Sequence, residues 1–260
     1  MPFTVSHIAG VLPFTSKRLS LPFAALAIGS MAPDLLYFIP PLIQYGTRTH
    51  EAPYLFTANL VLGLAAWVIW RLIAPLLHDV APEVVRERWR PDTWMSHPWW
   101  SVPVAIWIGI ATHIVLDHFT HSWGWGTRNI EAIAATYATP VGLKTGYELM
   151  QIGLSALGLV IILGVLLLQR RSVIQPSPVP TIQRLTFPLV LGAGVFGAIA
   201  RTAVVGGFDS RFEALAFYLL TGAVAGIVLA LTALCLLAAI ARGRIAERKP
   251  EGEMDDPAAT

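Results

Sequence analysis

Three ionisable side chains, His113, Asp117 and His121, lie four residues apart in the apolar stretch Ser101–His121. Four residues advance an α-helix by about 400°, so the three side chains share one stripe. The stretch is long enough to cross a bilayer, where a bare carboxylate costs several kcal/mol and usually has a partner and a function. Histidine and aspartate at this spacing can present two ligands to one metal ion. The stripe predicts a metal site, with a polar pair that braces a helix bundle as the alternative.

Other polar residues of the N-terminal half can reach the same level. His7 lies in the apolar N-terminal segment, Asp34 near the outer end of the first long apolar run, and Arg48 and His50 in the following loop. For His7 to meet the others, its segment must run inward and the next helix must return outward as a hairpin. Histidine and aspartate suit zinc, manganese or iron, and the geometry of the site chooses among these ions. An ion with an open position lowers the pKa of a bound water toward about 7.

The remaining histidines and the tryptophans have simpler explanations. His118 and His121 lie at the membrane interface, where a solvated histidine costs little, and we interpret both as interfacial residues. His78 and His97 fall toward the opposite side of the membrane and are expected to lie apart from the site. The tryptophans occur where aromatic belts belong, so they need no cofactor to explain them.

The composition is that of an integral membrane protein. Of the 260 residues 55% are hydrophobic and only 13% are charged, whereas a soluble domain carries about 25% charged residues. Cys235 is the single cysteine, which excludes an internal disulfide and a thiolate zinc site. The net charge of +2 says little about partners, because the charges are sorted by position and not massed. As partners of an integral membrane protein we expect membrane lipids and a lipid-like substrate, and no nucleic acid. The oligomeric state stays open.

Hydropathy predicts an all-α fold: a polytopic bundle of about six transmembrane helices preceded by a membrane-embedded N-terminal helical segment, Phe3–Phe14. A span needs about 20 apolar residues. The first run contains Pro33-Asp34 and ends in Pro40-Pro41, which predicts a shorter, broken helix. The six runs are Leu21–Ile43, Phe56–Leu77, Ser101–His121, Leu149–Gln169, Leu185–Val205 and Ala214–Ala241.

The basic residues predict the orientation of these spans. Thirteen of the eighteen lysines and arginines fall on one side, which the positive-inside rule makes cytoplasmic. The C-terminus is then cytoplasmic, and the His121 end of its span faces outward. We expect one membrane domain over residues 1–246, with the polar residues in 1–148 and a bland helical half in 149–246. Residues 247–260 are expected to be a disordered tail, and no removable signal peptide is recognised.

Four ordered motifs carry a resemblance to a known family. They are Met1–His7 (MPFTVSH), Gly29–Asp34 (GSMAPD), Arg48–His50 (RTH) and His113–Trp125 (HIVLDHFTHSWGW). Together they resemble an uncharacterised bacterial family of multi-pass membrane proteins, similar to the inner-membrane metal-dependent hydrolases of the YdjM-like, "LexA-binding" group. The resemblance covers roughly residues 1–125. It departs from that group before Thr49-His50, where Thr47-Arg48 replaces a His-Arg pair.

The resemblance implies that His7, Asp34, His50, His113 and Asp117 form a metal or catalytic set. We predict His7, His50, His113 and Asp117 as ligands of a divalent transition metal, with zinc first and manganese or iron as alternatives. Asp34 and Arg48 are the predicted catalytic residues, the first as general base and the second as the partner of an anionic substrate.

The expected function is hydrolysis of a lipid or lipid-linked ester or phosphodiester near the outer leaflet of the bacterial inner membrane. The alternatives are an ion- or proton-coupled transporter and a structural membrane protein that use the same buried residues. A transporter often has broken helices in two related halves. In this sequence only the first half is interrupted, which counts against that alternative.

Overall fold

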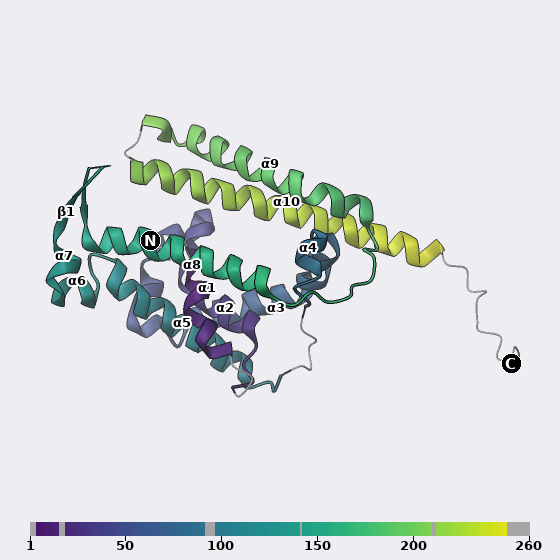
Figure 1. The fold of residues 1–260 in the computed structure, drawn as a ribbon, viewed down its shortest axis with the longest axis horizontal. Coiled ribbons are helices and arrows are strands. Elements are labelled where there is room, and N and C mark those ends of the chain that lie inside the picture. Colours follow the sequence, from purple (N-terminus) through teal and green to yellow (C-terminus); the bar gives the residue numbers. More distant parts are fainter. Residues whose placement is uncertain (1–3, 16–18, 92–96, 141, 210–211, 249–260) are drawn as a thin grey trace, which may run out of the picture. The chain divides into compact units, whose positions relative to one another are not determined.

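The computed structural model describes residues 4–15, 19–91, 97–140, 142–209 and 212–248 (Figure 1). The short N-terminal elements are η1 (Thr4–His7), α1 (Ile8–Val11), η2 (Leu12–Thr15), α2 (Phe23–Met31), η3 (Ala32–Phe38), η4 (Pro40–Tyr45), η5 (Arg48–His50) and η6 (Ala52–Tyr54). The middle contains α3 (Ala58–Val80), α4 (Glu83–Arg86), α5 (Ser101–Thr120), α6 (Trp125–Asn129), α7 (Glu131–Ala134), β1 (Thr136–Thr139) and β2 (Gly142–Thr145). The remainder is α8 (Gly146–Leu168), α9 (Pro180–Val204), η7 (Gly207–Asp209) and α10 (Phe212–Arg248).

The predicted all-α transmembrane fold is confirmed. Five of the described helices are long and apolar enough to cross a membrane, and a sixth span is obtained if one bent pair is counted. That pair, Phe23–Phe38 and Pro41–His50, turns by 118°. It lies in the run in which prolines predicted a broken helix. The helix breaks there because proline lacks the N–H that would continue the helical hydrogen bonds. The two short strands pair antiparallel, with Thr136 opposite Thr145.

The chain separates into two compact units. Unit 1 contains the described residues of Met1–Leu72 and Asp92–Gln169, and unit 2 those of Ile73–Pro91 and Arg170–Thr260. Composition alone divides the chain at residue 148, but α8 belongs to unit 1 because it packs on the N-terminal segment. A single domain over residues 1–246 stays a prediction. Of the predicted tail, 247 and 248 end α10, and residues 249–260 lie outside the described residues.

The core of unit 1 forms where α2 crosses α5. A Cβ atom on Gly29 would collide with the backbone of Ile106, and one on Gly109 would collide with the backbone of Leu26 and Ser30. Because neither position has a side chain, the two helices approach closely enough for their backbones to touch. Leu26 and Ile106 are fully buried at this crossing. The close approach sets the carbonyl of Ser30 beside α5.

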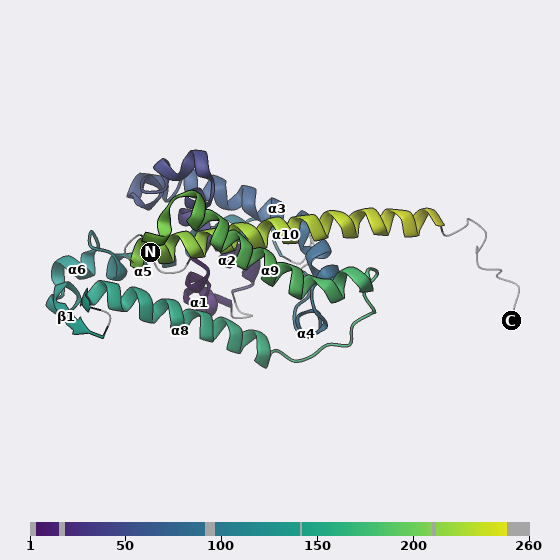
Figure 2. The same cartoon turned by 90° about the horizontal axis from the view of Figure 1, so that it is seen from above.

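The N-terminal segment packs in the same unit, as three short helices instead of one continuous helix. Val11 is fully buried in the core that α2 and α5 form. Gly158 of α8 lies against the backbone of Ser6, where a Cβ atom would come within 2.7 Å of the Ser6 carbonyl oxygen. Figures 1 and 2 both show α1 beside α8. These contacts fix the position of His7, the residue that follows Ser6, inside unit 1.

Unit 2 is built on a helical hairpin. α9 and α10 lie side by side along most of their length (Figure 2). Gly197 and Gly222 meet at a reciprocal backbone contact that leaves no room for a Cβ atom on either helix. A small core contains Val80, Ala238 and Cys235, so the cysteine is buried as expected.

Candidate metal centre

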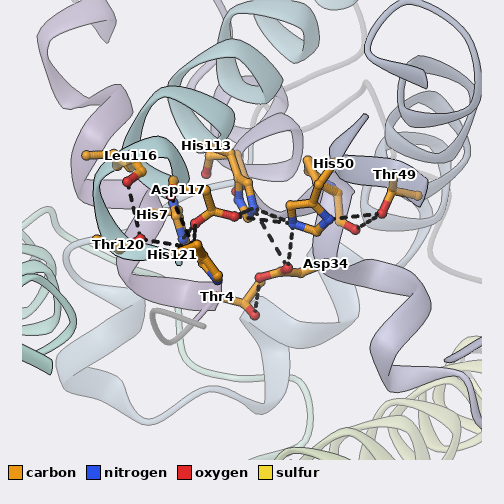
Figure 3. Close-up of polar contacts among 12 residues, drawn as sticks. Thr4, His7, Asp34, Thr49, His50, His113, Leu116, Asp117, Thr120 and His121 are labelled. Carbon is orange, nitrogen blue, oxygen red and sulfur yellow. Dashed lines mark hydrogen bonds and ion pairs between the residues drawn. The ribbon is translucent and has the colours of Figure 1, made fainter. Parts of the chain in front are cut away.

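Five of the six predicted site residues converge inside unit 1 (Figure 3). His7 comes from η1, Asp34 from η3, His50 from η5, and His113 and Asp117 from α5. Four of these side chains are at most 2% exposed, and the side chain of His50 is 9% exposed. Two sets of three among them could hold a metal ion: His50, His113 and Asp117, and also His7, Asp34 and His113.

Backbone carbonyls orient the two central imidazole rings. Nδ1 of His113 lies 2.7 Å from the carbonyl oxygen of Ser30, and Nδ1 of His50 lies 2.9 Å from that of Gly46. A carbonyl oxygen only accepts hydrogen bonds, so Nδ1 is the donor in both rings. In a neutral imidazole one nitrogen carries hydrogen, and each Nε2 then presents a lone pair. In a metal-binding histidine, the ring nitrogen that does not bind the metal commonly donates a hydrogen bond to a carbonyl or carboxylate.

The two lone pairs face each other and one carboxylate oxygen. Nε2 of His50 and Nε2 of His113 are 3.3 Å apart. Oδ2 of Asp117 lies 3.3 Å from the first and 3.2 Å from the second. Three electron-rich atoms this close need a positive charge among them, supplied by a metal ion or by protons on the rings. In a tetrahedral zinc site with bonds of about 2.0–2.1 Å, neighbouring ligand atoms lie about 3.3–3.4 Å apart, which matches this triangle.

Asp34 lies at the edge of the triangle. Its Oδ1 is 3.4 Å from Nε2 of His50 and 3.8 Å from Nε2 of His113, and makes no hydrogen bond among the described residues. Its other oxygen, Oδ2, accepts a hydrogen bond of 2.7 Å from the hydroxyl of Thr4. Asp34 is thus oriented by one oxygen while the other is free to complete a coordination shell or to take a proton.

The ring of His7 lies against one face of the His113 ring. The two rings stack with centroids 3.9 Å apart. Nε2 of His7 is 3.7 Å from Oδ1 of Asp117, and neither ring nitrogen of His7 has a hydrogen-bond partner among the described residues. A buried polar side chain in that situation requires an explanation, and a bound ion or an ordered water would supply one.

The loop that carries His50 is held by two polar residues that sequence reasoning did not single out. The Thr49 hydroxyl lies 2.6 Å from the carbonyl oxygens of both Pro33 and Gly46. The Asn59 amide, fully buried at the start of α3, donates to the carbonyl of Thr49 at 2.6 Å. The only signal in the sequence is an amide at the start of an apolar span, where a partner is required. Thr4 was also missed, although its position three residues before His7 puts both on one helical face.

Arg48 stands apart from the cluster. Its side chain is exposed, and its guanidinium carbon lies 5.8 Å from the ring centroid of Tyr45. The catalytic role predicted for Arg48 therefore stays a prediction. His78 belongs to unit 2, and Nδ1 of His97 donates to the carbonyl of Ser20. Both lie outside the cluster.

His121 contributes to the site although we expected an interfacial residue. Its Nδ1 lies 3.2 Å from the carbonyl oxygen and 3.4 Å from Oδ1 of Asp117, the contact that an i, i+4 spacing allows. Its ring stacks on Trp123 with centroids 5.4 Å apart. A cavity of about 300 Å³ opens beside this pair and reaches His50; its lining residues are Tyr37, Thr47, His50, Glu51, His121 and Trp123.

The buried histidines and aspartates of unit 1 could hold a metal ion beside a cavity large enough for a small molecule. A sequence model of one family, described as "Domain of unknown function (DUF4184)", matches residues 1–236. No curated protein and no solved structure gives a significant match to the chain. The match spans both units and thus extends well beyond the four motifs of the N-terminal half. The chain therefore belongs to the DUF4184 family, and the expected membership of an uncharacterised family is confirmed.

Proposed function

We propose that this protein is a membrane-embedded, metal-dependent hydrolase that cleaves an ester or phosphodiester of a lipid or lipid-linked molecule. The observation that carries the proposal is the triangle of Nε2 of His50, Nε2 of His113 and Oδ2 of Asp117, with edges of 3.2–3.3 Å. Buried ionisable residues in a membrane usually serve a function. The likeness of the sequence motifs to YdjM-like hydrolases agrees with the proposal.

Zinc is the ion that we propose. Its tetrahedral geometry with nitrogen and oxygen ligands fits the edges of the triangle, and it holds an open position in catalytic sites. Manganese and iron prefer more ligands, which His7 and Asp34 would have to supply together. His50, His113 and Asp117 are the proposed ligands of the tetrahedral site and leave its fourth position to water. His7, also predicted as a ligand, would bind only as a fifth ligand when the coordination shell expands.

The proposed reaction is attack by water on the carbonyl carbon or phosphorus atom of the substrate. An ion held by His50, His113 and Asp117 would supply a water of lowered pKa and would polarise the carbonyl or phosphoryl group of the substrate. Oδ1 of Asp34, close to both imidazoles, takes the proton of the attacking water. The same proton then goes to the leaving oxygen, so the carboxylate is regenerated. Arg48, in the exposed loop, would meet an anionic group of the substrate after a movement of its side chain.

For the location we propose the bacterial inner membrane, with the C-terminus in the cytoplasm and the cavity near the outer leaflet. The distribution of basic residues supports this orientation, in which the C-terminal end of α5, next to His121, would lie on the outer side. The substrate would then be reached at the depth of lipid headgroups.

Metal analysis of the purified protein tests the proposal. We expect about one zinc ion per chain by mass spectrometry, and loss of at least nine-tenths of it in Asp117→Ala. His97→Ala, which removes a histidine of the same unit outside the cluster, should keep the metal. The zinc-loaded protein should hydrolyse bis(p-nitrophenyl) phosphate or a short-chain lipid ester, and Asp117→Ala should be inactive.

A wild-type protein that takes up neither zinc, manganese nor iron would contradict the proposal. The rings would then be protonated, and the cluster would be a proton relay or a structural ion-pair network. Stoichiometric metal without turnover of any ester or phosphodiester would reject the hydrolase and leave a metal-binding membrane protein.

A further inference from the structure

The side chains that line the cavity fall into two chemically different sets, which we call its two walls. One wall is His50 and His121, which lead to the proposed ion through Asp117. The other wall is Glu51 with the aromatic rings of Tyr37 and Trp123. No lysine or arginine lines the cavity among the described residues. With an ion bound, the first wall would offer it to an anionic oxygen, whereas the second carries a carboxylate and electron-rich ring faces.

A carboxylate beside aromatic rings favours a cation. Ring faces attract ammonium groups within about 6 Å, and aromatic walls are a recurring way to recognise quaternary ammonium ligands. The first wall favours the opposite charge, since a divalent ion binds phosphate or carboxylate oxygens. A ligand that satisfies both walls carries an anionic and a cationic group close together.

The aromatic walls are held in place by the site itself. Trp123 stacks on His121 at an interplanar angle of 29°, and its ring centroid lies 6.4 Å from that of His50. Tyr37 lies 6.0 Å from the His50 ring and packs on Gly46, where a side chain would collide with the tyrosine ring. These contacts join the aromatic wall to His50, a proposed metal ligand. The anionic and the cationic group of a bound molecule would therefore both meet a preformed surface.

The size of the cavity restricts the ligand. A volume of about 300 Å³ is at the lower end of the range for small-molecule sites. It suits a headgroup with a few heavy atoms, whereas acyl chains would have to remain outside.

We propose that this cavity binds an alkylammonium phosphoester, with its phosphate toward the His50–His113–Asp117 triangle and its ammonium group against Glu51, Tyr37 and Trp123. The assignment rests on the proposed function, because the position of the phosphate depends on the ion. It names the substrate class as zwitterionic, in the form of either a lipid headgroup or a free small molecule.

Calorimetric titration of the full-length, zinc-loaded protein with phosphocholine tests the proposal. We expect phosphocholine to bind at least tenfold more tightly than inorganic phosphate, because only phosphocholine meets both walls. Glu51→Gln should reduce this preference about tenfold, and Trp123→Leu should reduce it in the same direction. Glu131→Gln, which removes an exposed carboxylate of the same unit away from the cavity, should keep it.

Equal affinity for phosphocholine and phosphate would overturn the proposal, as would a preference that survives both Glu51→Gln and Trp123→Leu. Glu51 is exposed, so its neutral isostere should fold even where the tryptophan variant does not.

A second arm identifies the source of the ligand. Competition with vesicles of phosphatidylcholine or phosphatidylethanolamine, but not phosphatidylglycerol, would support a lipid headgroup. Binding of free phosphocholine without competition by either vesicle would support a soluble phosphoester. Because binding is measured without turnover, a protein that prefers phosphocholine yet hydrolyses nothing would refute the hydrolase and retain the subsite. Turnover of bis(p-nitrophenyl) phosphate without a preference for phosphocholine would do the reverse.

Discussion

Among the single residues of the site, Asp117 connects the most partners. Oδ2 faces His50 and His113, while Oδ1 faces His7 and His121. An ion bound by the two neutral imidazoles of His50 and His113 would need an anion to offset its charge. Oδ2 of Asp117 is the carboxylate oxygen that faces both rings. Asp117 would therefore offset the charge of the proposed ion, and it contacts all four rings.

Asp117→Asn separates the charge of this residue from its shape. The amide has nearly the same size but no negative charge, so we expect at least a tenfold loss of zinc affinity with little change in thermal unfolding. Chelator competition and a melting curve in detergent measure the two quantities. Retention of wild-type affinity would mean that the ion lies elsewhere.

Thr4 acts on Asp34 through a single hydrogen bond. Thr4→Val keeps the volume of the side chain and removes the donor to Oδ2 of Asp34. Loss of such a supporting partner typically lowers metal affinity or activity about 10- to 100-fold. We expect that decrease, and we expect Thr4→Ser to recover most of it. The zinc dissociation constant and kcat are the measurements; a serine variant as impaired as the valine variant would argue against the hydrogen bond.

Among the elements of the fold, α5 is the central helix of the site. In its most apolar window 44% of the residues are buried within the protein, compared with 6% in α8. The crossing with α2 at Gly29 and Gly109 brings the Ser30 carbonyl to His113. The position of the His113 ring thus depends on the distance between α2 and α5.

Gly109→Ala tests this dependence. The added methyl would collide with the backbone of α2, and overpacking of this kind typically costs about 1–3 kcal/mol. We expect a lower melting temperature and a loss of zinc, because the Ser30 carbonyl moves away from His113. The control is Gly153→Ala in α8, where a Cβ atom meets nothing within 4 Å. Equal metal content in the two variants would show that the crossing does not position the site.

The sequence predicted the long helices, a helical N-terminal segment and a broken first helix, but not the 3₁₀ turns after that break or the β1–β2 hairpin. The run Ser101–His121 corresponds to α5, and the predicted span Phe56–Leu77 corresponds to α3. Hydropathy detects such spans because each is continuous and about as long as the bilayer is thick. The 3₁₀ turns between Ala32 and Tyr54 and the β1–β2 hairpin have no hydropathy signal. Their paths depend on prolines and on contacts between residues far apart in the sequence.

The sequence likewise predicted only part of the site. His7, Asp34, His113 and Asp117 stand out because ionisable groups are rare in apolar segments, whereas His50 lies in a loop and was predicted only through its motif. Thr4 and Thr49 do not stand out, since their acceptors lie 30 and 16 residues away in the sequence. The separation of Arg48 from the cluster also has no sequence signal, because it follows from the direction in which one loop side chain points.

For the whole molecule, the membrane explains the exposed apolar surface. Val160, Phe187 and Leu229 are 66–71% exposed on three of the long helices. Exposed apolar side chains of this kind would be an aggregation hazard in water, whereas the lipid tails of a membrane can cover them. The ionisable cluster, by contrast, is buried inside unit 1.

Cysteine labelling in intact cells tests the orientation of the whole chain. With Cys235 replaced by alanine, a membrane-impermeant maleimide should label Gln44→Cys in the predicted outer loop. It should label Ala258→Cys in the predicted cytoplasmic tail only after the cells are opened. The reverse pattern would place the cavity on the cytoplasmic side and require a substrate from the inner leaflet.

The hydrogen bonds from His113 and His50 to peptide carbonyls have a consequence for variation of the sequence. Acceptors on the main chain persist when the side chain of their residue is exchanged, so no substitution at position 30 deletes the acceptor for His113 directly. The choice of ring tautomer is encoded in the course of the backbone. For His113, variants that alter the tautomer should therefore occur at a glycine or proline that shapes that course, such as Gly29 or Pro33, sooner than at Ser30 itself.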